Sequence, residues 1–216
     1  MKRFKEYKAK ILVEELSKET RILSNTLVDT VYSKYVDEFD KTSIKCVGWL
    51  DGLENSQIRF QKIYEGGIGE NDSVLDVGCG VGHLHTYLKE QGWNGKYFGF
   101  DPNKKAIDLI DEEIDVIHGT IEDLDETKYD WAIANGVFNI GLKEEHMFWI
   151  LENMISHANK GIIFNGFDAP YPDPNYEAYD IDHVRFKLQK YDHTRIEIVE
   201  GYMERENEFT VYFYKV

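Results

Sequence analysis

The residues whose types and spacing could bind a ligand lie within 73–88, which reads SVLDVGCGVGHLHTYL. This stretch predicts a short buried strand, a turn with glycine at positions 78, 80 and 82, and the start of a helix. Glycine has no Cβ, so it takes positive φ and lets a ligand lie against the backbone, with free N–H groups at the helix start pointing at it. Such a turn is typical of a nucleotide site, although an ordinary tight strand-to-helix connection can carry the same glycines.

An acidic residue follows the next predicted strand. The apolar run 97–100 ends at Asp101, and Pro102 then starts a helical pattern. In a doubly wound sheet, an acid at the end of the second strand, about 20 residues past the glycines, binds the hydroxyls of a ribose. Cys79, within the glycine turn, fits a small turn residue better than a nucleophile.

Residues 74–82, VLDVGCGVG, resemble motif I of the class I S-adenosylmethionine-dependent methyltransferases, whose usual form is hydrophobic-hydrophobic-Asp-hydrophobic-Gly-Cys-Gly-x-Gly. A dinucleotide-binding fingerprint would place its third glycine at position 83, where this chain has His83. A nicotinamide or flavin enzyme is therefore the less favoured alternative. The resemblance extends more weakly from about Trp49 to the C-terminus. It implies an α/β fold with a doubly wound, mostly parallel, seven-stranded Rossmann-like sheet that ends in an antiparallel hairpin.

Composition and charge narrow the class of protein. The chain has 216 residues, of which 42% are hydrophobic, and this fits one domain with appendages. We expect an N-terminal helical extension or lid over 1–65 and a catalytic core over 66–216. The net charge of −15 disfavours a nucleic-acid substrate. Cys46 and Cys79 form no CxxC pair, so neither a disulfide framework nor a metal site is expected.

The N-terminal segment has apolar residues at helical spacing. Leu12 and Leu16, and then positions 23, 27, 31, 35 and 39, predict one or two amphipathic helices over about 5–39. These helices could pack against the core, form a homodimer face or close over a substrate as a lid. The apolar run within MKRFKEYKAKILVEEL is too short for a signal peptide or membrane span, which predicts a soluble cytoplasmic protein.

Residues 47–64 combine a tryptophan with a helical pattern. Many small class I methyltransferases carry a similar tryptophan, followed by a helix that folds over the cofactor. By this resemblance Trp49 lies at the cofactor, and Arg59 pairs the methionine carboxylate, because its planar guanidinium suits a carboxylate. The alternative is that Arg59 is a solvated helix residue.

The third predicted strand, 114–117, precedes the segment that would meet adenine. In the family, an Asp in a Gly-Asp pair often does so, and here Thr120 replaces it. Ile121 as an apolar wall, and Glu122 or Asp123 as an acceptor for the exocyclic amine, remain expected. A turn with a carboxylate at a helix start is the alternative.

The fourth predicted strand, 131–134, ends at Asn135 and Gly136, the family's motif IV position beside the reactive methyl. Enzymes that methylate amino groups of nucleic acids carry two prolines here, which this chain lacks. A helix over 144–158 and a strand over 161–167 follow, and the irregular segment 168–182 is our candidate for substrate contact. Apolar runs at 196–202 and 209–216 predict the closing hairpin.

The resemblance implies transfer of a methyl group from S-adenosylmethionine to a small-molecule acceptor. Alternatives are a methyltransferase acting on RNA or a protein, a dinucleotide oxidoreductase, and a cofactor-binding protein without activity. No general base is assigned among the histidines, of which His83 is best placed. The residues expected around the cofactor are Trp49, Arg59, Asp76, Val77, Gly78, Cys79, Gly80, Gly82, Asp101, Pro102, Thr120, Ile121, Glu122, Asn135 and Gly136.

Overall fold

The computed structural model describes residues 2–50, 52–140, 142–171, 173, 175–203 and 207–216, and within 2–17 it describes the backbone alone. Its strands are β1 (Val74–Val77), β2 (Tyr97–Asp101), β3 (Val116–His118), β4 (Tyr129–Ala134), β5 (Ala158–Asp168), β6 (Ala178–Tyr179), β7 (Arg195–Glu200) and β8 (Glu208–Tyr214). Its helices are α1 (Lys2–Glu38), α2 (Leu53–Glu65), α3 (His83–Glu90), α4 (Lys104–Ile107), α5 (Glu144–His157) and α6 (Ile181–Leu188), with short 3-10 helices η1 (Ile44–Val47) and η2 (Ile121–Asp123).

The strands form one sheet with the order β3-β2-β1-β4-β5-β8-β7, and β6 pairs with β5 outside this path. Strands β1 to β6 pair in parallel, whereas β8 runs antiparallel to both β5 and β7. The chain starts in the middle of the sheet at β1, extends to β3 on one side and then crosses to β4 on the other. This reversal opens a crevice at the carboxyl ends of β1 and β4, where such sheets bind ligands. The predicted mostly parallel sheet with a closing antiparallel hairpin is confirmed.

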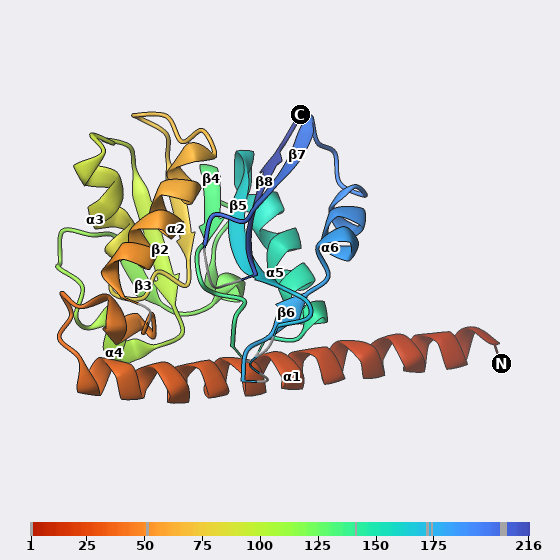
Figure 1. Cartoon of the computed structure of the whole chain (residues 1–216). Coiled ribbons are helices and arrows are strands. Elements are labelled where there is room, and N and C mark those ends of the chain that lie inside the picture. Colours follow the sequence, from red (N-terminus) through yellow and green to blue (C-terminus); the bar gives the residue numbers. More distant parts are fainter. Residues whose placement is uncertain (1, 51, 141, 172, 174, 204–206) are drawn as a thin grey trace.

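Helices cover both faces of the sheet, as the predicted class requires (Figure 1). On one face α2 and α3 bury Phe60, Ile63, Leu84 and Leu88 against the strands. On the other face α5 and α6 bury their own apolar side chains in a second cluster. Strand β4 serves both clusters, because side chains alternate along a strand: positions 131 and 133 belong to the first, and positions 132 and 134 to the second.

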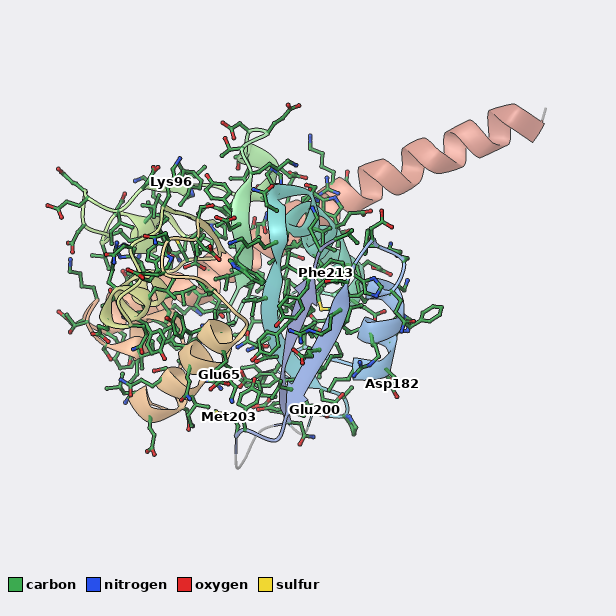
Figure 2. All side chains as sticks on the ribbon, turned by 90° about the horizontal axis from the view of Figure 1, so that it is seen from above. Glu65, Lys96, Asp182, Glu200, Met203 and Phe213 are labelled. Carbon is green, nitrogen blue, oxygen red and sulfur yellow. The ribbon has the colours of Figure 1, made fainter. Side chains whose placement is uncertain are left out.

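Helix α1 runs across the end of the sheet where the parallel strands finish, and its first turns extend past the rest of the molecule (Figures 1 and 2). The predicted N-terminal helical pattern therefore forms a single helix. The apolar residues of this helix have two different environments. Val28, Tyr32 and Val36 face a cavity below the helix, whereas Leu23 and Leu27 are exposed. The side chains of residues 12 and 16 lie outside the described residues.

The structure differs from the sequence prediction in two elements beyond β5. Within 168–182, predicted as irregular, the short strand β6 pairs with Phe167 and Asp168 at the end of β5. Helix α6 follows, with its N-terminus capped by the side chain of Asp180, which accepts a hydrogen bond from the His183 N–H group. The sequence 181–188 is too short to show a clear helical period, so tertiary packing of Val184 and Leu188 decides it.

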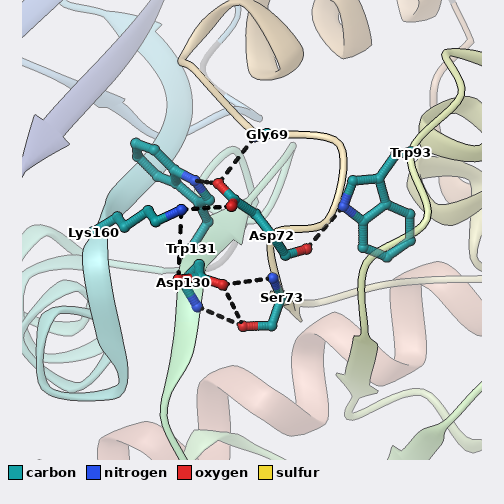
Figure 3. A network of polar contacts seen from close by, with 7 residues as sticks. All are labelled: Gly69, Asp72, Ser73, Trp93, Asp130, Trp131 and Lys160. Carbon is teal, nitrogen blue, oxygen red and sulfur yellow. Dashed lines mark hydrogen bonds and ion pairs between the residues drawn. The ribbon is translucent and has the colours of Figure 1, made fainter.

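A network of polar contacts joins the starts of β1, β4 and β5 at the opposite edge of the sheet (Figure 3). The Asp72 carboxylate accepts hydrogen bonds from the Gly69 N–H group at 2.9 Å and the Trp131 indole at 2.8 Å, and it pairs with Lys160. Lys160 also lies 3.7 Å from the Asp130 carboxylate. Although burial opposes the change, the hydrogen bonds from Lys160, Gly69 and Trp131 lower the pKa of Asp72.

Replacing Asp72 with alanine is expected to lower the free energy of unfolding by about 1–3 kcal/mol, because the indole N–H of buried Trp131 loses its partner. A carboxyl whose pKa is lowered in the folded state stabilises the protein above its unfolded pKa, near 3.9. The difference between wild type and D72A should therefore be full at pH 7 and shrink below about pH 4. Urea unfolding across this range measures it, with D115A at an exposed position as the control. A difference that is absent at pH 7 would contradict this role.

Candidate active site

A cavity lies at the carboxyl ends of β1, β2 and β4, between the sheet and α1. Its lining includes side chains from α1, η1, α2, the glycine turn after β1, the end of β2, η2, the segment after β4 and α5. The residues predicted around a cofactor that line it are Trp49, Asp76, Val77, Gly78, Cys79, Gly80, Asp101, Pro102, Thr120, Ile121, Glu122, Asn135 and Gly136. The lining does not include Gly82 or Arg59.

The glycine turn after β1 requires glycine for its shape. Gly78 and Gly80 have φ angles of 72° and 55°, in the left-handed region that side chains rarely adopt. A Cβ at Gly78 would lie 2.8 Å from the side chain of Val137, and one at Gly80 would lie 2.7 Å from Val47. At positions 78 and 80 the turn therefore lines the cavity with backbone atoms and no side chains, as the motif predicted.

The N–H groups of this turn are used within the protein. Gly78 and Cys79 both donate to the Phe100 carbonyl, at 2.9 and 3.0 Å, and Gly80 donates to the Asp101 carboxylate at 2.9 Å. The free N–H groups were predicted at the start of α3, whereas these three N–H groups of the turn are used within the protein and are not available to a ligand. Their bonds tie the end of β1 to the end of β2, so the turn offers a ligand close approach to the backbone.

Asp101 stands at the centre of this arrangement. Besides Gly80, its carboxylate accepts a hydrogen bond from the Asn103 N–H group at 2.7 Å. Burial raises the pKa of the Asp101 carboxyl to about 6, although these two hydrogen bonds lower it. Each oxygen keeps a further lone pair, so the carboxylate can accept two more hydrogen bonds, such as those of a vicinal diol.

Asp76, inside β1, is a second acid of the cavity, and its side chain is buried. Its carboxyl accepts a hydrogen bond from the Tyr97 hydroxyl at 2.6 Å. Burial raises its pKa to about 7, the Tyr97 hydrogen bond opposes this, and the nearby Asp101 adds to it. Cys79 is also buried, and burial raises the pKa of its thiol well above the ordinary value. The thiol stays protonated at neutral pH, which agrees with a turn residue rather than a nucleophile.

The segment after β3 lines the cavity with Thr120, Ile121 and Glu122. Thr120 caps η2: its hydroxyl accepts the Glu122 N–H group, and the Asp123 carboxylate accepts the Thr120 N–H group at 2.8 Å. The carboxylate of Glu122 pairs with Arg21 of α1 at 2.7 Å, and the Arg21 guanidinium also lies 4.5 Å from the centre of the Trp149 ring. Asp123 thus serves the helix start, as in the alternative reading, while Ile121 is a buried apolar wall.

Helix α1 is fastened along the cavity by polar contacts. Buried Asn103 donates to the Asp29 carbonyl at 3.2 Å and to the Ser33 hydroxyl at 3.0 Å. Tyr32, from the same helix, lines the cavity. Burial, and after it the nearby Asp101 carboxylate, hold the pKa of the Tyr32 phenol far above its ordinary value. Its hydroxyl is therefore a hydrogen-bond donor throughout the physiological range.

Arg59 does not have the position predicted for it. It is 5% exposed and forms a two-pronged ion pair with Glu208 of β8, with Nε and Nη2 each 2.8 Å from Oε2. Its guanidinium carbon also lies 5.1 Å from the centre of the Trp49 ring. A guanidinium held by a buried carboxylate is not available to a cofactor carboxylate, and it is not the solvated helix residue of the alternative reading either.

The motif IV segment after β4 is anchored by Asn165 of β5. The side-chain oxygen of Asn165 accepts the Gly136 N–H group at 2.7 Å. Its amide nitrogen donates to the side-chain oxygen of Asn135 at 2.8 Å and to Glu208 at 3.0 Å. At Gly136, where φ is 76°, a Cβ would lie 2.8 Å from the Trp49 indole nitrogen. Asn135, Gly136 and Trp49 therefore form one packed wall of the cavity.

Several lining residues were not found from the sequence. They are Arg21, Asn25, Val28, Tyr32 and Val36 of α1, together with Ile44, Cys46, Val47, Phe60, Leu84, Phe100, Asn103, Ala106, Val137, Leu142, His146, Trp149 and Ile150. His83, the histidine that the sequence placed best, also lines the cavity. Nε2 of His83 lies 3.1 Å from the Lys41 carbonyl oxygen, and partial burial of the imidazole lowers its pKa. Outside residues 172 and 174, which are not described, the segment 168–182 contributes no side chain to this cavity.

Comparison with known proteins gives the same class as the fold. Residues 74–161 match the model of a methyltransferase domain. The N-methyltransferase NodS from Bradyrhizobium japonicum WM9, solved with S-adenosylhomocysteine, has a TM-score of 0.67 at 15% identity, over 87% of this chain and 98% of that one. Magnesium protoporphyrin IX methyltransferase from Synechocystis PCC 6803, also solved with this product, has a TM-score of 0.64 at 15% identity, over 91% and 99%. No curated protein matches the chain by sequence.

The domain match over residues 74–161 and the doubly wound sheet with its antiparallel end give the chain the fold of the class I S-adenosylmethionine-dependent methyltransferases. The family resemblance predicted from residues 74–82 is confirmed. Among the described residues, no helix combines the length and apolar character needed to cross a membrane, α1 included.

Proposed function

We propose that the chain binds S-adenosylmethionine in the cavity below α1 and transfers its methyl group to a small-molecule acceptor. The observation that carries the proposal is the convergence of the glycine turn, Asp101, Ile121 and Asn135 on one cavity. These residues come from the ends of four different elements, and each had been expected there for a different part of the same cofactor.

The residues present fit this cofactor. The backbone wall at Gly78 and Gly80, which a Cβ would obstruct, suits the methionine portion. The Asp101 carboxylate has lone pairs for the two ribose hydroxyls. Ile121 and Phe100 are buried apolar walls for adenine, and the Arg21–Trp149 stack closes that end of the cavity.

The sulfonium of S-adenosylmethionine supplies an activated methyl group and a good leaving group. The protein then has to hold the acceptor in line with the methyl and exclude water. Helix α1 suits exclusion of water, because Val28, Tyr32 and Val36 cover the cavity and Asn103 fastens the helix to the core. We infer that the N-terminal helix acts as a lid over this site.

Two features favour a small-molecule acceptor over a polymer: the position of helix α1 over the cavity and the net charge of the chain. A helix lying across the mouth of the cavity leaves little room for a folded protein or a nucleic-acid strand. The net charge of −15 would repel a phosphate backbone. Of the two solved neighbours described above, one is named a magnesium protoporphyrin IX methyltransferase and the other an N-methyltransferase, and the acceptor of this chain is a separate question.

Calorimetric titration of the purified protein with S-adenosylmethionine, S-adenosylhomocysteine and NADH tests the proposal. We expect micromolar binding of the first two and none of the third. The A106W variant, which places a large side chain at a lining position, should weaken binding, whereas K96A at an exposed position should not. Binding of NADH alone, or unchanged binding in A106W, would contradict the proposed site.

A further inference from the structure

We propose that Asn165, held by the buried Arg59–Glu208 pair, turns the Asn135 side chain so that its amide nitrogen faces the cavity, and that the methyl acceptor presents an oxygen to it. The acceptor class is then a hydroxyl or carboxylate compound. This inference rests on the proposed function for the acceptor, whereas the orientation of Asn135 rests on the contacts alone.

The amide of Asn165 has one orientation. Its neighbours are the backbone N–H group of Gly136, which can only donate, and the ion-paired carboxylate of Glu208, which can only accept. The side-chain oxygen of Asn165 must therefore face Gly136, and its nitrogen must face Glu208. Asn165 is 1% exposed, so no solvent competes for either contact.

The orientation of Asn135 follows from that of Asn165. The Asn165 nitrogen has two hydrogens, one for Glu208 and one for the Asn135 side chain at 2.8 Å. If the Asn135 amide were reversed, two NH₂ groups would face each other and both would be unsatisfied. The oxygen of Asn135 is therefore directed at Asn165, and its amide nitrogen is the group directed away from Asn165, toward the cavity that Asn135 lines.

The Arg59–Glu208 pair makes this arrangement rigid. Glu208 is 2% exposed, and Arg59 binds its carboxylate through Nε and Nη2. A carboxylate held in this way cannot rotate to release Asn165 without leaving a buried guanidinium unpaired. The pair joins α2 to β8. Because Glu208 also accepts a hydrogen bond from Asn165 of β5, the pair fixes Asn165 and, through it, the motif IV segment.

A donor at this position selects the acceptor atom. An amine nucleophile must keep its lone pair for the methyl, so its own hydrogens need acceptors, and the Asn135 nitrogen offers none. A hydroxyl or carboxylate oxygen has lone pairs to spare, and one of them can accept from Asn135 while another faces the methyl. The hydrogen bond also stabilises the anionic form of a hydroxyl.

In the reaction the acceptor oxygen forms the new bond to the methyl carbon. The bond between that carbon and sulfur breaks, and its electron pair remains on sulfur, which becomes neutral. A carboxylate acceptor enters without a proton. A hydroxyl acceptor gives its proton to solvent, and the products are the methyl ether or ester and S-adenosylhomocysteine.

The orientation is tested by hydrogen exchange of side-chain amides, measured by NMR on protein labelled with ¹⁵N-asparagine and without any ligand. The signals of Asn135 and Asn165 are identified by their loss in N135D and N165D. We expect both hydrogens of the Asn165 amide to exchange about 100-fold or more slowly than those of the Asn135 amide. Protected Asn135 hydrogens together with rapidly exchanging Asn165 hydrogens would overturn the proposal.

The N135D variant separates a role in acceptor recognition from a role in cofactor binding. Aspartate keeps the oxygen that accepts from Asn165, so the fold should be retained, and only the donor is lost. We expect S-adenosylhomocysteine affinity within about threefold of wild type. A loss of tenfold or more would place the amide on the cofactor and overturn the inference. Failure of wild-type protein to bind S-adenosylhomocysteine, with the exchange pattern as expected, would instead refute the proposed function.

Transfer of labelled methyl groups to matched compounds tests the acceptor atom. The compounds carry a hydroxyl, carboxyl or amino group on the same scaffold, so that only the acceptor atom differs. We expect transfer to an oxygen member and a loss of tenfold or more in N135D. Faster transfer to the amino member in wild type would overturn the proposal, and the exchange measurement decides the orientation whichever compounds react.

Discussion

Replacing Asp101 with alanine is expected to weaken binding of S-adenosylmethionine by about 100-fold or more. Two hydrogen bonds from ribose hydroxyls to a half-buried carboxylate are worth roughly 1.5–3 kcal/mol each. The change also removes the acceptor of the Gly80 N–H group, which holds the glycine turn in place. Calorimetry measures the affinity. D108A is the matched control, because it removes the same charge from an exposed residue at the end of α4.

The conservative variant D101N separates charge from shape. It keeps an oxygen for Gly80 or the ribose but loses the negative charge, so a loss of about tenfold is expected. Wild-type affinity in D101A would contradict the assignment of the ribose site. Equal losses in D101A and D108A would point to a general effect of charge.

The same carboxylate predicts how wild-type affinity depends on pH. The pKa of Asp101 is about 6 in the free protein, because burial disfavours its charge. Below this pH the carboxyl is neutral and is a weaker acceptor for the ribose. Affinity should therefore fall as the pH is lowered from 7 to 5, and this fall should be smaller in D101A.

Replacing Arg59 with methionine is expected to lower the free energy of unfolding by about 3–5 kcal/mol. Glu208 would be left as a buried charge without its partner, and removing one member of a buried pair has a cost of this size. The double variant R59M/E208Q should recover part of the loss, because glutamine leaves no buried charge and its side-chain oxygen still accepts from Asn165. Urea denaturation at pH 7 measures both.

The control is K62M on the same helix, which removes a lysine that pairs with Glu65 near the surface. Exposed pairs of this kind contribute about 0–1 kcal/mol. A decrease of less than about 1 kcal/mol in the free energy of unfolding of R59M would show that the Arg59–Glu208 pair is exposed to solvent. A loss in the double variant equal to that of R59M would mean that packing, rather than charge, sets the cost.

Local patterns were sufficient to predict the centre of the site. The strand, glycine turn and helix within 73–88 are close in sequence, and so is the acid that ends β2. Their geometry follows from backbone preferences of glycine and from the short connections of a doubly wound sheet. For the same reason Asn135 could be placed at the cavity, since it directly follows a buried strand.

Contacts between distant segments could not be predicted in this way. Arg59 was expected at a ligand, but its partner is 149 residues away along the chain. The helical period of α1 indicated an apolar face without saying what it would cover. Only the folded chain shows that Val28 and Tyr32 face the cavity while Leu23 and Leu27 remain exposed. The N–H groups of Gly78 and Cys79 are used by Phe100 because β1 and β2 end side by side.

The most direct test of the proposed cofactor site is a crystal structure of the protein with S-adenosylhomocysteine. We expect the ribose hydroxyls within hydrogen-bond distance of the Asp101 carboxylate, the homocysteine portion against Gly78 and Gly80, and adenine beside Ile121 under α1. The Asn135 amide nitrogen should remain open toward the side where an acceptor enters. Product bound outside this cavity, or ribose hydroxyls without contact to Asp101, would contradict the proposed site.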